Sequence, residues 1–90
     1  MPQAVVDPEE LERFAKSLKQ FDSDLSGRMS HLKGQFANLG GTWRDQTHAK
    51  FAQDFQQAMG VLERFIREAE AHIPVLMRQA GDVRRYQGKG

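Results

Sequence analysis

Apolar residues recur every three or four positions along most of the chain, and this spacing constrains the fold more than any other feature. In the first half they are Leu11, Phe14, Leu18, Phe21, Leu25, Met29, Leu32, Phe36 and Leu39. At about 100° per residue, these positions fall on one stripe of a helix. Asp7 and Pro8 stand before the stripe, where an N-cap and a first helical residue belong. The pattern predicts a helix over about residues 8–38 and no strand.

Adjacent glycines interrupt the pattern after Leu39. Glycine adopts left-handed conformations at little cost and commonly ends helices, so we expect the first helix to end at Gly40 and Gly41. Thr42 is the expected cap of the next helix. A turn of residues 39–44 is short, and a second helix that follows it must fold back antiparallel to the first.

The second half predicts a helix over about residues 45–85. Its apolar positions are Phe51, Phe55, Ala58, Met59, Leu62, Phe65, Ile66, Ala69, Ile73, Leu76, Met77, Ala80 and Val83. Proline removes a backbone donor, but the apolar register continues beyond Pro74, which favours a kink near Pro74 over a stop.

The apolar stripe of the second helix is wider than that of the first, roughly 120° against roughly 80° on an ideal helical wheel. One neighbouring helix cannot cover so broad a face. The excess is expected on two flanks, with Met59, Ile66 and Met77 on one, and Phe65 and Val83 on the other. This excess indicates a second partner.

The expected fold class is therefore all-α, a single domain over residues 1–90 that forms an antiparallel helical hairpin and dimerises into a four-helix bundle. The chain has 90 residues and no cysteine, so no disulfide can supplement a small core. The residues expected in the hairpin or dimer interface are Leu18, Phe21, Leu25, Leu32, Phe55, Met59, Leu62, Ile66, Ile73 and Leu76.

Composition and motifs argue against several functions. The net charge is +1, with 13 basic and 12 acidic residues, so nothing favours nucleic acid as a partner. The sequence contains no run of about 18 apolar residues, so membrane insertion is not expected. The three histidines lack metal-ligand spacing, and no nucleophile or phosphate-binding motif is present. We expect no catalytic residue, no metal and no cofactor, hence no enzyme.

The last helical turns are basic and end in a tyrosine. Cations at a helix C-terminus are favoured by the helix dipole, which accounts for Arg84 and Arg85 structurally. A docking role for Arg84, Arg85 and Tyr86 is the functional alternative.

Trp43 is unusual for a turn, where polar residues suffice. One interpretation is a hydrophobic plug over the end of the bundle, against Phe51 or Leu39. The other is a recognition feature displayed at the tip of the hairpin. The two interpretations are compatible.

The region around Trp43 resembles the WXG family, the small helical-hairpin proteins of type VII (ESX) secretion. The resemblance lies in Gly40-Gly41-Thr42-Trp43-Arg44-Asp45-Gln46 followed by Phe51 and Phe55, and in the length, helix order and central tryptophan of nearly the whole chain. Gly40, Gly41, Trp43 and Asp45 are the expected turn and recognition motif. Asp45 stands where the family has glycine, and aspartate can adopt a left-handed conformation or cap a helix in its place.

The resemblance implies a non-enzymatic substrate or escort of a type VII secretion system. Such a protein is made in the bacterial cytoplasm, exported without a cleavable signal peptide, and paired with itself or a related hairpin. A secretion ATPase or a larger effector would be its further partner. The implied recognition surface joins the Trp43 turn of one protomer to the C-terminal segment of the other.

The family's Tyr-x-x-x-Asp/Glu export signal is incomplete, because Gly90 stands four residues after Tyr86. The signal then lies on a partner chain, another feature is read, or this chain is not itself exported. The alternative function is an intracellular, cytoplasmic dimeric adaptor or a chaperone-like partner of a larger effector.

Overall fold

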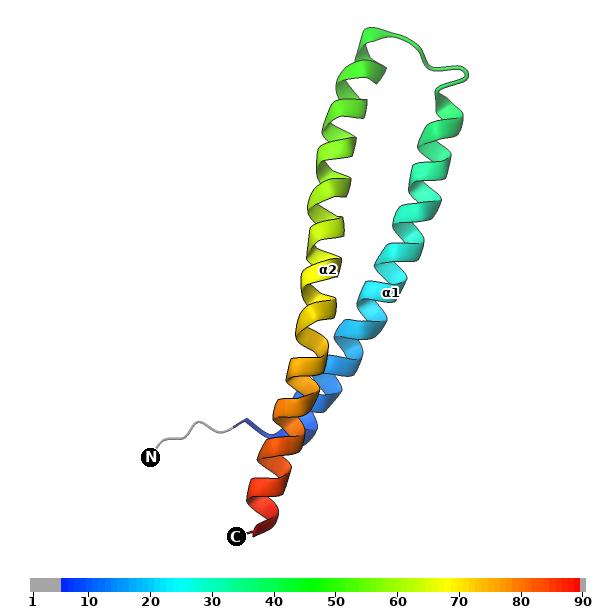
Figure 1. Cartoon of the computed structure of the whole chain (residues 1–90). Coiled ribbons are helices and arrows are strands. Elements are labelled where there is room, and N and C mark those ends of the chain that lie inside the picture. The colour runs from blue at the N-terminus through cyan, green and yellow to red at the C-terminus, as the bar shows by residue number, and fades with distance from the viewer. Residues whose placement is uncertain (1–5, 90) are drawn as a thin grey trace.

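The protein is a hairpin of two antiparallel helices (Figure 1). The computed structural model describes residues 6–89, with side chains through residue 86, so residues 1–5 and 90 of the expected domain lie outside the described part. Helix α1 spans Pro8–Leu39 and helix α2 spans Gln46–Lys89. They form a rod of 67 × 22 × 15 Å, with the start of α1 and the end of α2 at the end opposite the turn. The all-α class and the hairpin expected from the sequence are confirmed.

Helix α1 begins with a side-chain cap. The carboxylate of Asp7 accepts a hydrogen bond of 2.9 Å from the backbone amide of Glu9, which would otherwise lack a partner in the first turn. Pro8 follows as the first helical residue, where its missing N–H costs nothing. Glu9 and Glu10 add negative charge near the positive end of the helix dipole.

Helix α1 ends by tightening, without a left-handed residue. The amides of Gly40, Gly41 and Thr42 each donate to the carbonyl three residues earlier, at 3.2, 3.3 and 3.0 Å. Gly40 has φ −59° and ψ −18°, and no glycine within residues 6–89 has a positive φ. A 3₁₀-type turn therefore pairs the last carbonyls of α1 from right-handed conformations. A Cβ on Gly40 would lie 3.2 Å from the carbonyl oxygen of Ala37, so the turn uses the small size of glycine.

Asp45, and not Thr42, caps α2. The carboxylate of Asp45 accepts a hydrogen bond of 3.0 Å from the amide of His48, the third residue of the helix. The hydroxyl of Thr42 instead donates to the carbonyl of Leu39 at 3.4 Å. The expected cap at Thr42 is wrong because the helix begins at Gln46, and only the residue directly before it can reach the unpaired amides of the first turn.

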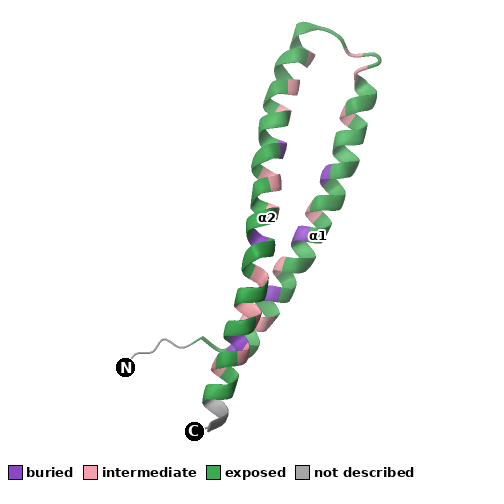
Figure 2. Ribbon diagram, viewed as in Figure 1, coloured by how far each residue is buried: buried purple, intermediate pink, exposed green. Residues whose placement is uncertain are grey.

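The two helices meet along a narrow seam of buried and half-buried side chains, seen in Figure 2 as the purple and pink positions on the facing sides. On α1 the seam residues alternate in steps of four and three, as in coiled coils. They are Leu11, Ala15, Leu18, Asp22, Leu25 and Met29. The fully buried apolar residues are mostly small, with Ala15, Ala69 and Ala80 beside Met29 and Met59. The hairpin therefore buries little apolar surface by itself.

Helix α2 is continuous through Pro74 and extends to Lys89, beyond the expected end at residue 85. Proline removes one backbone donor, but apolar and small residues on both sides of it stay in the seam. These are Ile73, Leu76 and Ala80. Packing against α1 thus offsets the local cost of the proline.

Candidate functional site

Five aromatic rings form a cluster at the turn end of the hairpin: Phe36, Trp43, His48, Phe51 and Phe55. The His48 ring stacks on Phe36 at a centroid distance of 5.1 Å and an interplanar angle of 4°. Trp43 meets His48 edge to face at 4.9 Å and Phe51 at 6.2 Å. Such offset and edge-to-face pairs each stabilise by about 0.5–1.5 kcal/mol beyond the area they bury. The cluster fixes the turn on the first two turns of α2.

Trp43 is half-buried within this cluster. Its contacts with His48 and Phe51 cover the open end of the seam, while the rest of the side chain remains accessible to a partner. The sequence did not single out Phe36 or His48. The spacing of His48, Phe51 and Phe55 by three and four residues places three rings on one face of the helix, and this pattern could have identified His48.

One side of the hairpin carries large apolar side chains that no part of the described chain covers. We call this surface the apolar flank. It comprises Phe14, Phe21, Leu32 and Leu39 of α1, exposed by 58, 52, 46 and 45%, and Phe51 and Phe65 of α2, exposed by 45 and 42%. The two helices share the surface, since the rings of Phe21 and Phe65 meet edge to face at 6.1 Å.

Near the turn, the apolar flank opens into a groove of about 660 Å³. Leu32 and Leu39 line it from α1 and Phe51 from α2, with Phe36, Phe55 and Met59 at the seam. Contiguous exposed apolar surface of this kind marks a site that binds a protein, a ligand or a membrane surface.

The structure divides the residues expected at an interface into two groups. Phe21 and Leu32 are exposed on the apolar flank, and Met59 is buried at the seam. The others are half-buried at the seam: Leu18, Leu25, Phe55, Leu62, Ile66, Ile73 and Leu76.

The expectation of excess apolar surface on the side of α2 that carries Met59, Ile66 and Met77 is wrong. Met59 is only 9% exposed, and Ile66 and Met77 are half-buried. The width of an apolar stripe does not reveal where the neighbouring helix lies across it. On the other expected flank, Phe65 is exposed and Val83 is half-buried.

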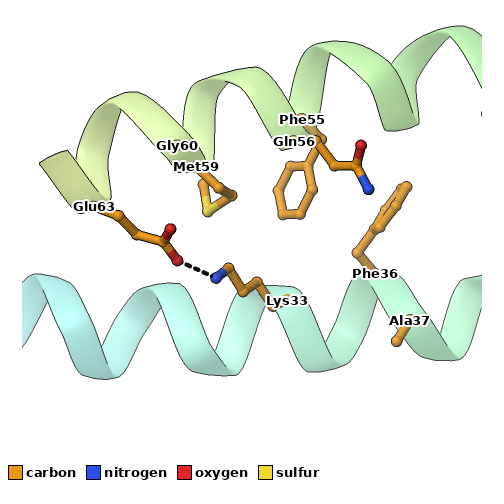
Figure 3. A pocket seen from close by; sticks show the side chains of 8 residues that line it. All are labelled: Lys33, Phe36, Ala37, Phe55, Gln56, Met59, Gly60 and Glu63. Atoms are coloured by element: carbon orange, nitrogen blue, oxygen red, sulfur yellow. Dashed lines mark hydrogen bonds and ion pairs between the residues drawn. The ribbon is translucent and has the colours of Figure 1, made fainter.

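The opposite side of the hairpin is polar and contains small residues. There the ammonium of Lys33 donates to the carboxylate of Glu63 at 2.5 Å, bridging the helices (Figure 3). This hydrogen bond and the charge of Lys33 lower the pKa of Glu63 below its usual value of 4.5. Beside the pair lies a groove of about 360 Å³, which Ala37 and Gly60 leave open.

The C-terminal end offers less free charge than the sequence indicates. Arg84 pairs with Glu12 across the helices at 3.4 Å, and Arg85 pairs with Asp82 within α2. Tyr86 is 81% exposed. The Arg85 side chain is also largely exposed, at 79%, whereas that of Arg84 is 47% exposed.

The described residues provide no site for a metal and no membrane span. Within residues 6–89, no three histidine or carboxylate side chains come together as ligands would. Neither described helix includes a stretch that is long and apolar enough to cross a bilayer.

The chain is similar in sequence and in structure to known proteins. The family model WXG100, "Proteins of 100 residues with WXG", matches residues 3–86. No curated protein matches the chain by sequence.

Several crystal structures of the secreted protein EsxB from Bacillus anthracis str. Sterne are similar to the chain. The selenomethionine-labelled form is 30% identical with a TM-score of 0.74, covering 97% of this chain and 99% of EsxB. The wild-type form, in space group P21, is 31% identical with a TM-score of 0.73, covering 93% of this chain and 97% of EsxB. A point mutant is 30% identical with a TM-score of 0.77, covering 94% and 96%. With its two-helix hairpin and its central tryptophan turn, the chain belongs to the WXG100 family.

Proposed function

We propose that this protein is a substrate or escort of a type VII secretion system and that it acts by binding, without catalysis. The match to WXG100 over residues 3–86 carries this proposal, and the similar EsxB structures are those of a secreted protein. The hairpin pairs through its apolar flank with a second helical hairpin. The pair is then recognised by a secretion ATPase or carries a larger effector.

The exposed flank supports the pairing step. Six large side chains at 42–58% exposure constitute an apolar surface that is costly to leave in water, at about 25 cal/mol per Å². Most of the apolar residues buried in the seam are alanines, so the single hairpin buries little apolar surface to stabilise it. Association therefore supplies both partner recognition and much of the stability of the fold.

The turn supports the recognition step. Trp43 is held by His48 and Phe51 at the tip of the rod, so its accessible edge is presented in one orientation. Asp45 fixes the start of α2 directly after it, in place of the glycine of the family motif. A receptor can thus read a rigid tip, with Tyr86 of the paired hairpin as a second contact. A preorganised surface binds with less loss of conformational entropy.

Export is tested in the native bacterium with the tagged chain and a strain whose secretion ATPase is inactive. The chain should appear in the culture supernatant of the parent and be lost from that of the mutant strain. Trp43→Ala should reduce export while circular dichroism still shows a helical protein, and Trp43→Phe, which keeps a ring in the cluster, should retain more of it. Accumulation only in the cytoplasm of the parent strain would contradict the proposal and favour an intracellular adaptor.

A further inference from the structure

We propose that a groove on the polar side of the hairpin binds an arginine side chain, presented by a helix of a partner protein. The groove has a volume of about 450 Å³ and is lined by residues of both helices: Lys19, Asp22, Ser23, Ser26, Glu70 and Ile73. At about 100° per residue, its α1 residues lie across the seam from Phe14 and Phe21. The proposal therefore goes beyond the pairing through the apolar flank and concerns a surface which that pairing leaves free.

The carboxylate of Asp22 indicates what the groove binds. Asp22 is only 3% exposed, and neither of its oxygens accepts a hydrogen bond from the described residues. A buried carboxylate loses its hydration, and a cation or a set of hydrogen-bond donors must replace that hydration. The described hairpin supplies neither, although Asp22 lines a groove that a ligand can enter. The missing partner of this carboxylate is therefore expected to come from outside the hairpin.

The charges that line the groove favour a cation. Glu70 contributes a second carboxylate from α2, and Lys19 contributes the one ammonium group, so the two carboxylates outweigh it by one negative charge. Lys19 and Glu70 are exposed, and neither belongs to an ion pair among the described side chains. Both side chains are thus free to turn outwards when a cation enters and reaches Asp22.

A guanidinium group fits this groove better than a metal ion does. Its planar fork of N–H donors pairs with one carboxylate through two hydrogen bonds and has donors left for further acceptors. Asp22 and Glu70 supply carboxylates from the two helices, and the hydroxyls of Ser23 and Ser26 supply neutral acceptors. A metal ion needs a fuller set of ligands, and within residues 6–89 no three carboxylate or histidine side chains come together.

Small residues beside the groove indicate that the arginine belongs to a helix. They follow one another on α1 in steps of four and three: Ser23, Gly27, Ser30, Gly34 and Ala37. A Cβ on Gly27 or Gly34 would meet nothing within 4 Å, so no described side chain packs against these glycines. Glycine inside a helix is destabilising, but a face without side chains allows another backbone to approach closely. A partner helix on this face would place its arginine beside Asp22.

Nuclear magnetic resonance of the full chain tests the site, with N-acetylarginine amide as the probe at constant ionic strength. The probe should shift the carboxyl carbon of Asp22 and the backbone amides of Ser23 and Ser26 in a saturable way. The citrulline analogue has nearly the same shape without the charge and should bind about tenfold more weakly. Absence of saturable shifts, or equal binding of the two probes, would overturn the site.

Variants identify the group that holds the probe. Asp22→Asn should weaken binding of the arginine probe by about tenfold, whereas Asp24→Asn, an exposed position outside the groove, should change it by less than about twofold. Lys19→Met should tighten binding, because it removes a competing cation. Circular dichroism checks that each variant keeps its helices. Unchanged binding in Asp22→Asn, weaker binding in Lys19→Met, or tighter saturation of the same signals by Ca²⁺ would contradict an arginine site.

A helical peptide tests whether the arginine comes from a partner helix. The probe is an alanine- and glutamine-rich peptide of about 16 residues with one central arginine. It should bind at least about fivefold more tightly than N-acetylarginine amide, because its backbone packs along the small residues of α1. Gly27→Leu should remove this gain and leave binding of the blocked amino acid within about twofold. A peptide that binds no more tightly than the blocked amino acid would overturn the partner helix.

Discussion

The carboxylate of Asp22 lies in the seam between α1 and α2, where the neighbouring positions along the helix are apolar. Asp22 is 3% exposed, and neither of its side-chain oxygens has a hydrogen-bond partner. A buried polar group without a partner costs about 1–3 kcal/mol, and more when it is charged. Replacing Asp22 with leucine removes this cost and adds apolar burial.

The magnitude follows from the surroundings of Asp22. It borders a groove of about 450 Å³, so a larger side chain can be accommodated. Fully burying a leucine contributes about 1.5–3 kcal/mol, and partial filling of an open groove contributes less. We expect Asp22→Leu to raise the free energy of unfolding by about 2–4 kcal/mol. The nearly isosteric Asp22→Asn removes the charge but keeps buried polar atoms that need hydrogen-bond partners. It should raise the free energy of unfolding by about 1 kcal/mol.

The assay is equilibrium urea unfolding followed by circular dichroism, at one fixed protein concentration because association contributes to stability. Asp54→Leu on the exposed side of α2 is the matched control and should change stability by about 0.5 kcal/mol or less. A loss of stability in Asp22→Leu would refute the reasoning. It would mean that the carboxylate is paired in solution, and Lys19→Met, which removes the cation bordering the same groove, should then be destabilising as well.

Further predictions concern the caps, the ion pair and the glycines. Asp45→Ala should lower the free energy of unfolding by about 1 kcal/mol through loss of the α2 cap, and Thr42→Ala by less, as thermal unfolding will show. The pKa of Glu63 is lowered in the fold, so its stabilising pair should be lost as the pH falls below 4.5. A pH titration of stability should then show a shallower acid limb for Glu63→Gln. Gly34→Ala should stabilise by about 0.5–1 kcal/mol in urea unfolding, since its Cβ would meet nothing within 4 Å.

Much of this protein could be predicted from the sequence because helix periodicity and helix ends are local properties. Steps of three and four from Leu11 to Leu39 require only the geometry of one helix. Asp7 and Pro8 act within the first turn of α1, as their identities suggest. A short turn with two glycines leaves an antiparallel partner as the only way to bury both stripes. Class, helix order and hairpin topology therefore follow from local rules.

The position of the seam within the stripes was decided by the tertiary structure. Phe14 and Phe21 belong to the apolar stripe of α1 but are exposed, whereas Ala15 and Asp22 lie outside the predicted stripe and are buried. Periodicity ranks residues by their angle on one helix, whereas burial depends on where the second helix packs against it. Small residues such as Ala15 allow close approach of the two backbones, so the seam follows them and leaves the large rings outside. The same packing buries Met59 in the seam and leaves Phe65 exposed. The apolar flank is therefore defined only when both helices are in place.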